Sequence, residues 1–496
     1  MGAIWSKEAR EGNQQPEASN NPSESLSNTQ AGSKRERVEH QSSNAKRLKT
    51  AKQRKEFFQQ NISWKAQTEK GEPAPRPEGP KAPRLPKKKV AMMIGFNGTG
   101  YQGMQINPNV KTIESELFDA MCKAGAISSD NSDDPKKVQW MRAARTDKGV
   151  HAAGNLVSLK IVVPGDDVVE RINSFLPPQI RVWGMEEARK KKSLTDTIIP
   201  GYIPTMRSFH AKTACDSRVY EYLLPTYAFM PPANKELTEE PTLPTDLKLC
   251  SNSDGTVRYV SRSTPEELAD KDAYRISADD LDNFKKALSM FVGTHNFHNY
   301  TIARKHTDKS ANRFIISINV ADPIYINGTE WLSVKLHGQS FMLHQIRKMI
   351  SMALLSVRSK TPLSIIEKSF GPEKINIPKA PALGLLLERP VFAIYNKKAD
   401  SNKDKKFRDP IDFDIHKSQI DAFKQEWIYS KIFETEKEER GFDAFLLSVD
   451  SHLGSDYKYL NPEGIIPEEA IIVTKYSASA ETNDDDINED AEENED

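Results

Sequence analysis

Residues 312–338 read NRFIISINVADPIYINGTEWLSVKLHG, which is two alternating apolar runs on either side of an Asn-Gly pair. Asn327-Gly328 favours a two-residue turn because both residue types tolerate positive φ. The apolar side chains that share one face are Ile316, Ile318, Val320, Leu332, Val334 and Leu336. The stretch therefore predicts a β-hairpin with one buried face.

Helical patterns flank this hairpin on both sides. Ser277 to Asp280 has the form of a capping box, and the apolar residues behind it recur at helical spacing until Gly293. A longer amphipathic helix is predicted after Ser340. Strands at 218–224 and 383–387 open and close this unit, which gives the order β-α-β-β-α-β.

The same order occurs upstream. Strands are predicted at 90–96, 138–144, 155–163 and 180–185, with helices starting at Thr112 and Asp166. Two such units predict an α+β fold of two ferredoxin-like (β-α-β-β-α-β) halves, joined in one extended antiparallel sheet with a central cleft. Helices cover one face of each half, so we expect the other faces to stay free and to form a concave cradle for a large ligand.

Composition divides the 496-residue chain into unlike parts. Residues 1–90 hold 19 basic and 10 acidic groups, whereas residues 481–496 hold ten carboxylates and no Lys or Arg. Such polar ends cannot bury enough surface to offset their ordering entropy. The predicted parts are a disordered basic region (1–86), a first α+β unit (87–205), a second α+β unit (206–396), an accessory helical extension (397–476) and a disordered acidic tail (477–496).

The N-terminal region carries candidate targeting signals. Lys34-Arg35 and, after ten intervening residues, Lys46-Arg47-Leu48-Lys49 are typical of a bipartite nuclear localisation signal, which predicts a nuclear protein that binds an import receptor. A solvated basic tail or a phosphate-binding arm is the alternative. Met1 to Ser6 also fits the myristoylation pattern, without a second anchor. No run of eighteen apolar residues occurs and the three cysteines are widely spaced, so neither a membrane span nor a disulfide framework is predicted.

Asp147 is the candidate catalytic carboxylate. It lies in Arg142–His151, the loop between the second and third predicted strands, with Arg145 and Lys148 beside it and Gly149 permitting a tight bend. Neighbouring cations favour the ionised form, so we expect a carboxylate at neutral pH. A salt-bridged structural turn is the alternative that this pattern leaves open.

Arg347 is the candidate partner of Asp147. It is the only charge on the apolar stripe of the helix predicted after Ser340, and an unpaired buried charge is costly. It needs an acceptor, and we predict Asp147 rather than a backbone carbonyl or Glu367. On strand 218–224, Tyr220 offers a ring that can stack on a base, although a tyrosine in a strand usually serves packing.

Two patterns that suggest cofactor or metal binding are weak. Phe96 to Gly103 is glycine-rich after a strand but lacks the Gly-Lys-Ser/Thr ending of a phosphate loop, so a turn near RNA fits better than a nucleotide cofactor. His295 and His298 have no Cys or carboxylate at ligand spacing. We predict neither a cofactor nor a metal site.

Four motifs, over roughly residues 87–396, resemble the TruA-type family of tRNA pseudouridine synthases. They are ARTDKGVHA (144–152), RVYEY (218–222), FMLHQIR (341–347) and APALGL (380–385). Lys148, the segment LPPQIRV (176–182) and the long tails point to the eukaryotic branch of the family, that of tRNA pseudouridine synthase 1.

The resemblance implies an isomerase that converts uridines at several tRNA positions to pseudouridine, with small nuclear RNA and messenger RNA as further candidate substrates. It implies Asp147, Arg347 and Tyr220 as catalytic residues, with Tyr220, Arg145, Lys148 and His151 contacting the substrate. No cofactor is required, because the reaction has no net redox change, group donor or hydrolysis. Attack on the sugar, attack on the uracil ring and removal of a sugar proton all stay open as the first step. Lys87, Lys88, Lys89 and Arg142 are further predicted phosphate contacts.

Two other functions are compatible with parts of the pattern. In a non-catalytic RNA-binding protein on the same scaffold, Asp147 would be a turn residue and Arg347 a phosphate contact. A glycosidase would need paired carboxylates. Glu221 is the only other carboxylate in the three motifs nearest the predicted site, and it alternates onto the face opposite Tyr220.

Overall fold

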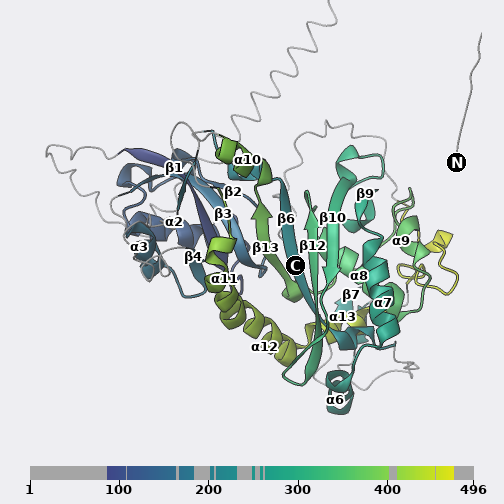
Figure 1. Ribbon diagram of the computed structural model, residues 1–496. Helices are drawn as coiled ribbons and strands as arrows, with labels where there is room; N and C mark the ends of the chain where they lie inside the picture. Colours follow the sequence, from purple (N-terminus) through teal and green to yellow (C-terminus); the bar gives the residue numbers. More distant parts are fainter. Residues whose placement is uncertain are drawn as a thin grey trace, which may run out of the picture. The chain divides into compact units, whose positions relative to one another are not determined.

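The computed structural model describes residues 86–107, 109–163, 167–183, 202–205, 208–231, 248–251, 257–260, 263–401, 410–452 and 454–473 (Figure 1). The predicted targeting signals and the predicted acidic tail lie outside these residues. Within them, no helix has both the length and the hydropathy to cross a lipid bilayer.

Strands from both halves of the chain form one sheet. Its members are β1 (Lys87–Phe96), β2 (Met141–Arg142), β3 (His151–Val162), β4 (Ile180–Val182), β5 (Ile203–Pro204), β6 (Ser217–Pro225), β9 (Gly293–Asn296), β10 (Asn312–Val320), β11 (Ile324–Ile326), β12 (Thr329–Gly338) and β13 (Leu385–Val391). The order is β4-β1-β3-β13-β6-β12-β10-β9, with β5 beside β1, β2 beside β3 and β11 beside β12. A separate pair joins β7 (Lys248–Ser251) to β8 (Val257–Val260).

The helices fall into those of the two halves and those of the C-terminal extension. The first half contributes α2 (Ile113–Lys123) and α3 (Val168–Phe175), followed by the short α5 (Ala211–Ala214). The second half contributes α6 (Pro265–Ala273), α7 (Ala278–Ser289), α8 (Gln345–Arg358) and α9 (Ser364–Lys368). The extension contains α10 (Ala393–Ser401), α11 (Lys417–Phe423), a π-helical segment (Lys424–Tyr429), α12 (Ser430–Glu439) and α13 (Gly441–Asp450).

The predicted duplication is confirmed, and the two halves meet along β3 and β13. Each half has the strand order expected of a ferredoxin-like unit. The order is β4-β1-β3-β2 in the first half and β13-β6-β12-β10 in the second. β13 runs antiparallel to β6 but parallel to β3, where Leu386 lies opposite His151 and Leu387 opposite Ala152. The sheet is therefore mixed rather than wholly antiparallel.

The strand predicted at 138–144 is much shorter in the structure. A 3-10 turn takes Pro135–Val138, and β2 pairs only Met141 and Arg142 with Ser158 and Val157 of β3. β13 then pairs with the beginning of β3, which leaves the segment between β2 and β3 as a loop at the junction of the two halves.

The predicted hairpin is present as β10, β11 and β12. Asn327 and Gly328 adopt φ of 51° and 94°, as a tight turn requires. One inward position was predicted wrongly: Ile316 is 39% exposed, while Ile315 is buried. The pairing of β10 with β12 shifts between Ile315 and Ser317, and this bulge turns Ile316 outward.

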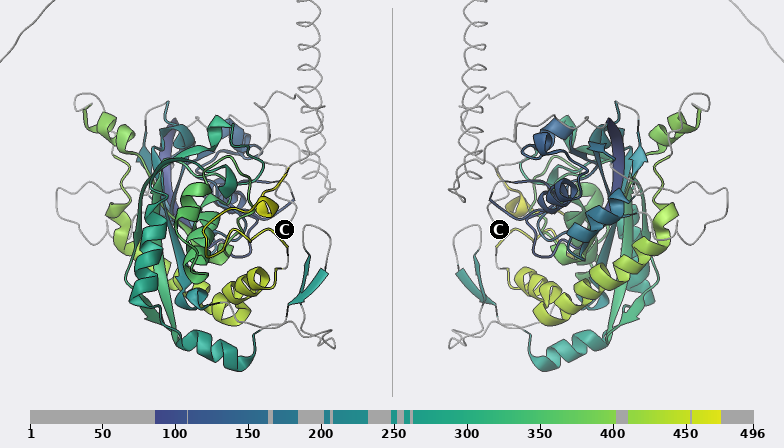
Figure 2. Two further views of the ribbon diagram at one scale, coloured as in Figure 1. Left: turned by 90° about the vertical axis from the view of Figure 1, so that its right-hand side faces the viewer. Right: turned by 90° about the vertical axis from the view of Figure 1, so that its left-hand side faces the viewer.

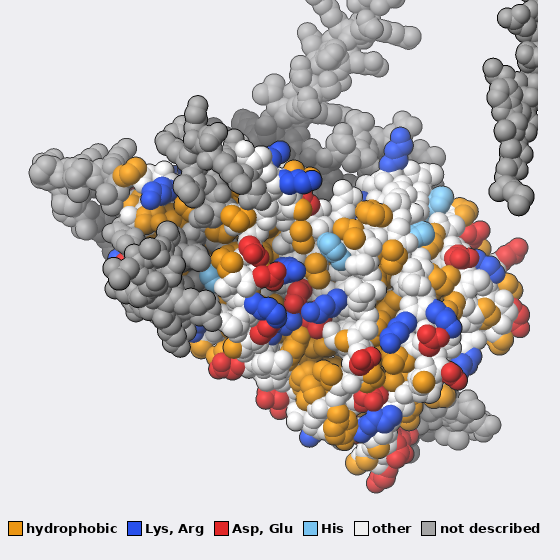
Figure 3. All heavy atoms as spheres, in the orientation of Figure 1, with side chains coloured by type: hydrophobic (Ala, Val, Ile, Leu, Met, Phe, Trp, Pro, Cys, Tyr) orange, Lys and Arg blue, Asp and Glu red, His pale blue; other side chains and the backbone are white. Residues whose placement is uncertain are grey.

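The expectation of a free, concave sheet face was wrong for the middle of the sheet. α2 and α3 pack on one face of the first half, and α7 and α8 pack on the same face of the second. The extension covers the opposite face: Ile420, Phe423 and Phe433 are buried there with Leu223 and Leu386 of β6 and β13. The side views in Figure 2 accordingly show helices on both sides of the strands. The face seen in Figure 3 carries Lys and Arg intermixed with Asp and Glu near its middle, rather than a field of one sign.

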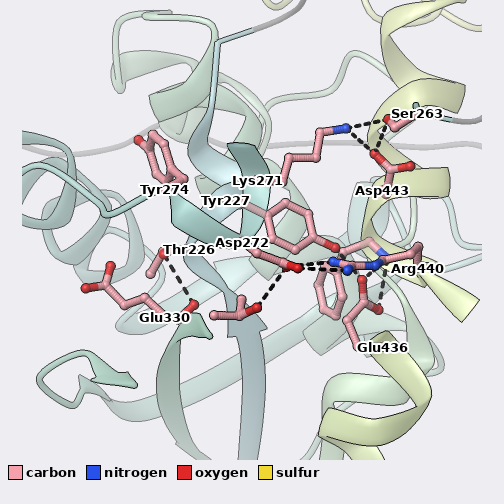
Figure 4. Close-up of polar contacts among 12 residues, drawn as sticks. Thr226, Tyr227, Ser263, Lys271, Asp272, Tyr274, Glu330, Glu436, Arg440 and Asp443 are labelled. Atoms are coloured by element: carbon pink, nitrogen blue, oxygen red, sulfur yellow. Dashed lines mark hydrogen bonds and ion pairs between the residues drawn. The ribbon is translucent and has the colours of Figure 1, made fainter. Parts of the chain in front are cut away.

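Paired buried charges fasten the extension to the body. Lys424 Nζ donates to Glu221 Oε2 at 2.9 Å and to Glu388 Oε2 at 2.6 Å. At the C-terminal end of α12, Arg440 forms a bidentate pair with Asp272, with N···O distances of 2.7 and 2.9 Å (Figure 4). Tyr227 donates to Glu436 in the same cluster. These contacts tie the extension to the second half, because Glu221 lies on β6, Glu388 on β13 and Asp272 on α6.

Candidate active site

The loop that carries Asp147 is held by the glycine-rich segment that follows β1. The Met104 N–H donates to Thr146 O at 3.1 Å, and the Gly149 N–H donates to Tyr101 O at 3.2 Å. Gly149 has φ of 74°, which lets the loop bend back toward β3. The backbone of one loop thus fixes the backbone of the other.

Two glycines of this segment make the close approach possible. A Cβ on Gly98 would lie 2.3 Å from Val150 O, and one on Gly103 would lie 2.8 Å from Thr146 O. The glycine density that suggests a phosphate loop thus serves backbone packing against the Asp147 loop.

Arg347 reaches the same place from the second half. It lies in the first turn of α8, where its Nε donates to Ala380 O at 2.6 Å. Its charge acts on Asp147 and also on Tyr222. The backbone carbonyl that the sequence left open as an alternative is therefore the acceptor of Arg347 Nε, and Arg347 influences Asp147 through its charge, without a direct ion pair between them among the described residues.

The electrostatic environment of Asp147 differs from the one predicted. Protein atoms crowd the carboxyl although 37% of the side chain is exposed, and this burial raises its pKa, against the charges of Arg347 and Lys379. Arg145 and Lys148, the sequence neighbours expected to supply the field, have exposed side chains. Burial outweighs the two charges, so the pKa of Asp147 lies above its ordinary value although Arg347 and Lys379 of the second half oppose the shift.

His344 is a neighbour of Asp147 that the sequence analysis did not single out. Its Nδ1 lies 3.9 Å from Asp147 Oδ2. The residue adopts φ of 60° and ψ of 0° immediately before α8, a conformation that is unfavourable for a non-glycine residue. Bonds from Thr301 to the Leu343 carbonyl and from the Lys348 N–H to the His344 carbonyl hold it there. The only sequence feature that could have pointed to His344 as a neighbour of Asp147 is its position one helical turn before Arg347.

Tyr220 lies on the Asp147 side of the sheet. Its ring meets that of Phe341 edge to face, with centroids 5.3 Å apart. Burial raises the pKa of Tyr220, the Arg218 charge opposes this, and the Asp147 charge raises the pKa further. The structure thus brings Asp147, Arg347 and Tyr220 into one electrostatic neighbourhood, while their catalytic roles stay predictions.

Three side chains that were predicted to contact RNA have partners within the first half. His151 is 1% exposed, and its Nδ1 accepts from the Gly98 N–H at 3.1 Å, so it supports the loop rather than facing a ligand. Arg142 forms a bidentate pair with the buried Glu114. Lys89 is buried and donates to Gln139 O at 3.1 Å. In each case the side chain is already used inside the first half.

The remaining candidates divide by exposure and by face. Arg145 and Lys148, like Lys87 and Lys88, are exposed and accessible to a ligand. Glu221 lies on the opposite face with Lys424, so it cannot pair with Asp147. Within the described residues, no acidic side chain acts on the Asp147 carboxyl.

No metal centre is evident in the part of the chain that the structure describes, where no three His, Cys, Asp or Glu side chains are grouped to hold an ion. His295 stacks on Phe370 with centroids 4.4 Å apart, whereas His298 meets His306. The two histidines considered as ligands therefore have separate packing partners.

Comparison with known proteins agrees with the four sequence motifs. Residues 287–393 match the family model described as tRNA pseudouridine synthase. A protein of Yarrowia lipolytica named tRNA pseudouridine synthase 1 is 42% identical over 436 residues, covering 78% of each chain. The Saccharomyces cerevisiae protein of the same name is 41% identical over 417 residues, covering 75% of this chain and 73% of the other. The pseudouridylate synthase 1 homolog of Mus musculus is 35% identical over 372 residues, covering 74% and 75%. At these identities and coverages, the chain belongs to the TruA-type family of tRNA pseudouridine synthases.

Proposed function

We propose that this protein is an isomerase that converts uridine to pseudouridine at several positions of tRNA, with Asp147 as the catalytic carboxylate. The observation that carries the proposal is the effect of the Arg347 charge, from the second half, on the carboxyl of Asp147 from the first half, in the loop that precedes the parallel pairing of β3 with β13. The relatives named tRNA pseudouridine synthase 1 support tRNA as the substrate.

The geometry suits a reaction with one carboxylate. Isomerisation detaches the uracil, rotates it and reattaches it through carbon, so it consumes no second substrate. Asp147 initiates cleavage of the glycosidic bond. Arg347 and Lys379 favour its ionised form against burial, and His344 approaches the same carboxyl. The detached base has to stay in the site, which requires a closed and poorly hydrated complex.

Tyr220 and the exposed basic residues of the loop complete the proposed site. The Tyr220 ring stacks on the extruded uracil, and its hydroxyl, close enough to feel the Asp147 charge, can carry a proton in the last step. Arg145 and Lys148 hold the nucleotide that has left its stack. Small nuclear RNA and messenger RNA are further proposed substrates, and the basic clusters at 34–35 and 46–49 are the basis for proposing a nuclear protein that binds an import receptor.

A direct test is to incubate the purified protein with unmodified tRNA transcripts, without added cofactor, and to map pseudouridine by site. Asp147→Asn should abolish product, while thermal unfolding and tRNA affinity stay close to wild type. Asp119→Asn, an exposed carboxylate on α2, is the matched control and should keep full activity.

The same test separates the alternatives. Full pseudouridine yield from Asp147→Asn would contradict the catalytic role. A wild-type protein that binds tRNA but forms no product would favour the non-catalytic RNA-binding protein. Release of free uracil into solution would favour a glycosidase.

A further inference from the structure

His344 occupies the N-cap position of α8 without capping the helix. Its side chain makes no capping hydrogen bond, and its backbone has φ of 60° and ψ of 0°. N-cap residues normally have an extended backbone and a short polar side chain that accepts from a helix N–H. Thr112, Thr264 and Ser277, which cap α2, α6 and α7, follow this rule. His344 therefore forgoes a cap and holds a left-handed backbone, and both features cost stability.

The chain on either side of His344 enforces this backbone. Besides the bonds to the Leu343 and His344 carbonyls described above, Met342 and Gln345 bond to each other across it. The Met342 N–H donates to Gln345 Oε1 at 2.9 Å, and the Gln345 N–H donates to Met342 O at 3.1 Å. A left-handed residue other than glycine persists only where its surroundings over-determine it, and such residues gather at functional sites. The conformation therefore points to a role for the His344 side chain.

The imidazole of His344 faces the carboxyl of Asp147. Nδ1 lies 3.9 Å from Oδ2, and the His344 side chain is 13% exposed. A direct hydrogen bond needs a separation of about 3 Å. Hydrogen bonds in active sites are often long before substrate binds and tighten in the complex. A movement of about 1 Å would bring Nδ1–H into contact with the carboxylate oxygen.

A bond from His344 would do something that the nearby charges do not. Arg347 and Lys379 act on Asp147 through their charge, which favours the ionised carboxyl against burial. Arg347 Nε is bonded to the Ala380 carbonyl. A charge at a distance favours ionisation, whereas a hydrogen bond also fixes the direction in which a carboxylate oxygen points.

We propose that His344 is a positioning residue of the active site, whose Nδ1–H donates to Asp147 Oδ2 when RNA is bound and turns the other carboxylate oxygen toward the reacting nucleotide. The proposal rests on the proposed function, which makes Asp147 the catalytic carboxylate. The left-handed backbone is the means of placement, because an extended N-cap residue would direct its side chain elsewhere. The stability that α8 loses at its first residue is thus exchanged for the orientation of the carboxylate.

His344→Gly separates this role from a structural one. Glycine accepts the positive φ without strain, so the unfolding temperature of the full-length variant should equal or exceed that of wild type. Single-turnover pseudouridine formation in an unmodified tRNA transcript should fall about 30-fold, with unchanged tRNA affinity. The acidic limb of the pH–rate profile should move to higher pH, because loss of a donor raises the pKa of Asp147. A wild-type rate and pH profile would overturn the proposal.

His344→Asn and His344→Asp form a matched pair, because both residues tolerate a left-handed backbone and have the same size. The asparagine amide can donate from about the place of Nδ1, so the rate should return to within about threefold of wild type. The aspartate has no donor and repels Asp147, so its rate should be at least about 100-fold lower than that of wild type. Equal rates of the two variants would overturn the proposal, and this pair carries the test if His344→Gly unfolds.

Lys360→Gly is the control for a change of backbone freedom. Lys360 has φ of 57° at the other end of α8 and an exposed side chain, so this variant should keep the wild-type rate and pH profile. Pseudouridine yields of wild type and Asp147→Asn are measured beside it. Product that depends on Asp147 but not on His344 refutes the positioning role alone. Full yield from Asp147→Asn refutes the proposed function, and the positioning role falls with it.

Discussion

Buried charges are treated differently in two regions of this protein, the contacts of the C-terminal extension and the surroundings of Asp147. In the extension, charges meet their counterparts directly: Lys424 contacts Glu221 and Glu388, and Arg358 forms a bidentate pair with Asp450. Such pairing fixes one arrangement, because removing either member leaves a buried charge uncompensated.

Around Asp147 the charges stay only partly compensated. Arg347 Nε donates to the Ala380 carbonyl, and the Arg347 charge lowers the pKa of Asp147 without a direct ion pair between them in the described structure. Lys348 Nζ donates to two backbone carbonyls rather than to a carboxylate. A region built for stability alone would neutralise these groups. The difference therefore suggests that the extension is built to stay in place, whereas the site is built to be completed by a ligand.

The largest effect is expected in the extension. Lys424→Met leaves Glu221 buried without its cation and should lower the free energy of unfolding by about 3–5 kcal/mol. Denaturant unfolding checks this value. Lys417→Met removes an exposed pair with Asp421 and should cost less than about 0.5 kcal/mol. Equal stability of the two variants would mean that the buried network does not hold the extension.

A pH effect of similar size is expected from Glu436. Burial raises its pKa to about 7 from an ordinary value of 4.5. Between these values the folded protein holds a proton that the unfolded chain has lost, so the unfolding free energy should fall as pH rises, by about 3 kcal/mol in total. This stabilisation is complete below pH 4.5 and is lost as pH rises through 7.

Thermal unfolding across this pH range gives the test. Glu436→Gln should flatten the decline, because the amide does not titrate, although it keeps an acceptor for Tyr227. Glu438→Gln, an exposed change on the same helix, should leave the decline as in wild type. A variant at Glu436 that retains the full pH dependence would assign the effect to another group.

The duplicated fold was predictable because its signals are local. The Asn327-Gly328 turn and the capping residue Ser277 specify their elements without reference to the rest of the chain. The covered sheet face was not predictable. Ile420, Phe423 and Trp427 indicate a helix with one apolar face, but no local pattern says which surface that face covers. The bulge at Ile316 was missed for the same reason, since it depends on the partner strand.

The residues of the candidate site also fall into those that local sequence signals predict and those that depend on how the two halves meet. Asp147, Arg347 and Tyr220 were reached through motifs and through the argument that a buried arginine needs an acceptor. His344 and Lys379 were missed because their distance from Asp147 depends on how α8 and the segment before β13 meet the first half. The burial of His151 was not anticipated, because it depends on the pairing of β3 with β13, which no pattern within either strand shows.

The two arginines of α8 allow the two regions to be compared on one helix, because Arg347 acts on Asp147 and Arg358 pairs with Asp450 of the extension. Arg347→Gln removes a cation that favours ionised Asp147, so activity near pH 7 should fall about 100-fold, equivalent to about 2.7 kcal/mol in the barrier. The acidic limb of the pH–rate profile should move to higher pH, because the pKa of Asp147 rises further. Arg358→Gln leaves Asp450 without its partner, so it should lower the unfolding temperature but keep the activity of the folded fraction. If Arg347→Gln instead lowers the unfolding temperature and keeps the activity of the folded fraction, Arg347 is a structural residue.

The smallest effect is expected for two neighbouring tyrosines on β6 that face the same way. Tyr220→Phe keeps the ring against Phe341 but removes the hydroxyl near Asp147, so pseudouridine formation should fall about tenfold with an unchanged unfolding temperature. Tyr222→Phe removes a bond of 2.7 Å to the Pro381 carbonyl and should cost about 1 kcal/mol of stability while the rate stays near wild type. Single-turnover rates and unfolding curves of both variants check the two halves of this prediction. If Tyr220→Phe turns over at the wild-type rate, its role is confined to stacking, and the final proton passes through another group near Asp147, of which His344 is the nearest imidazole in the described structure.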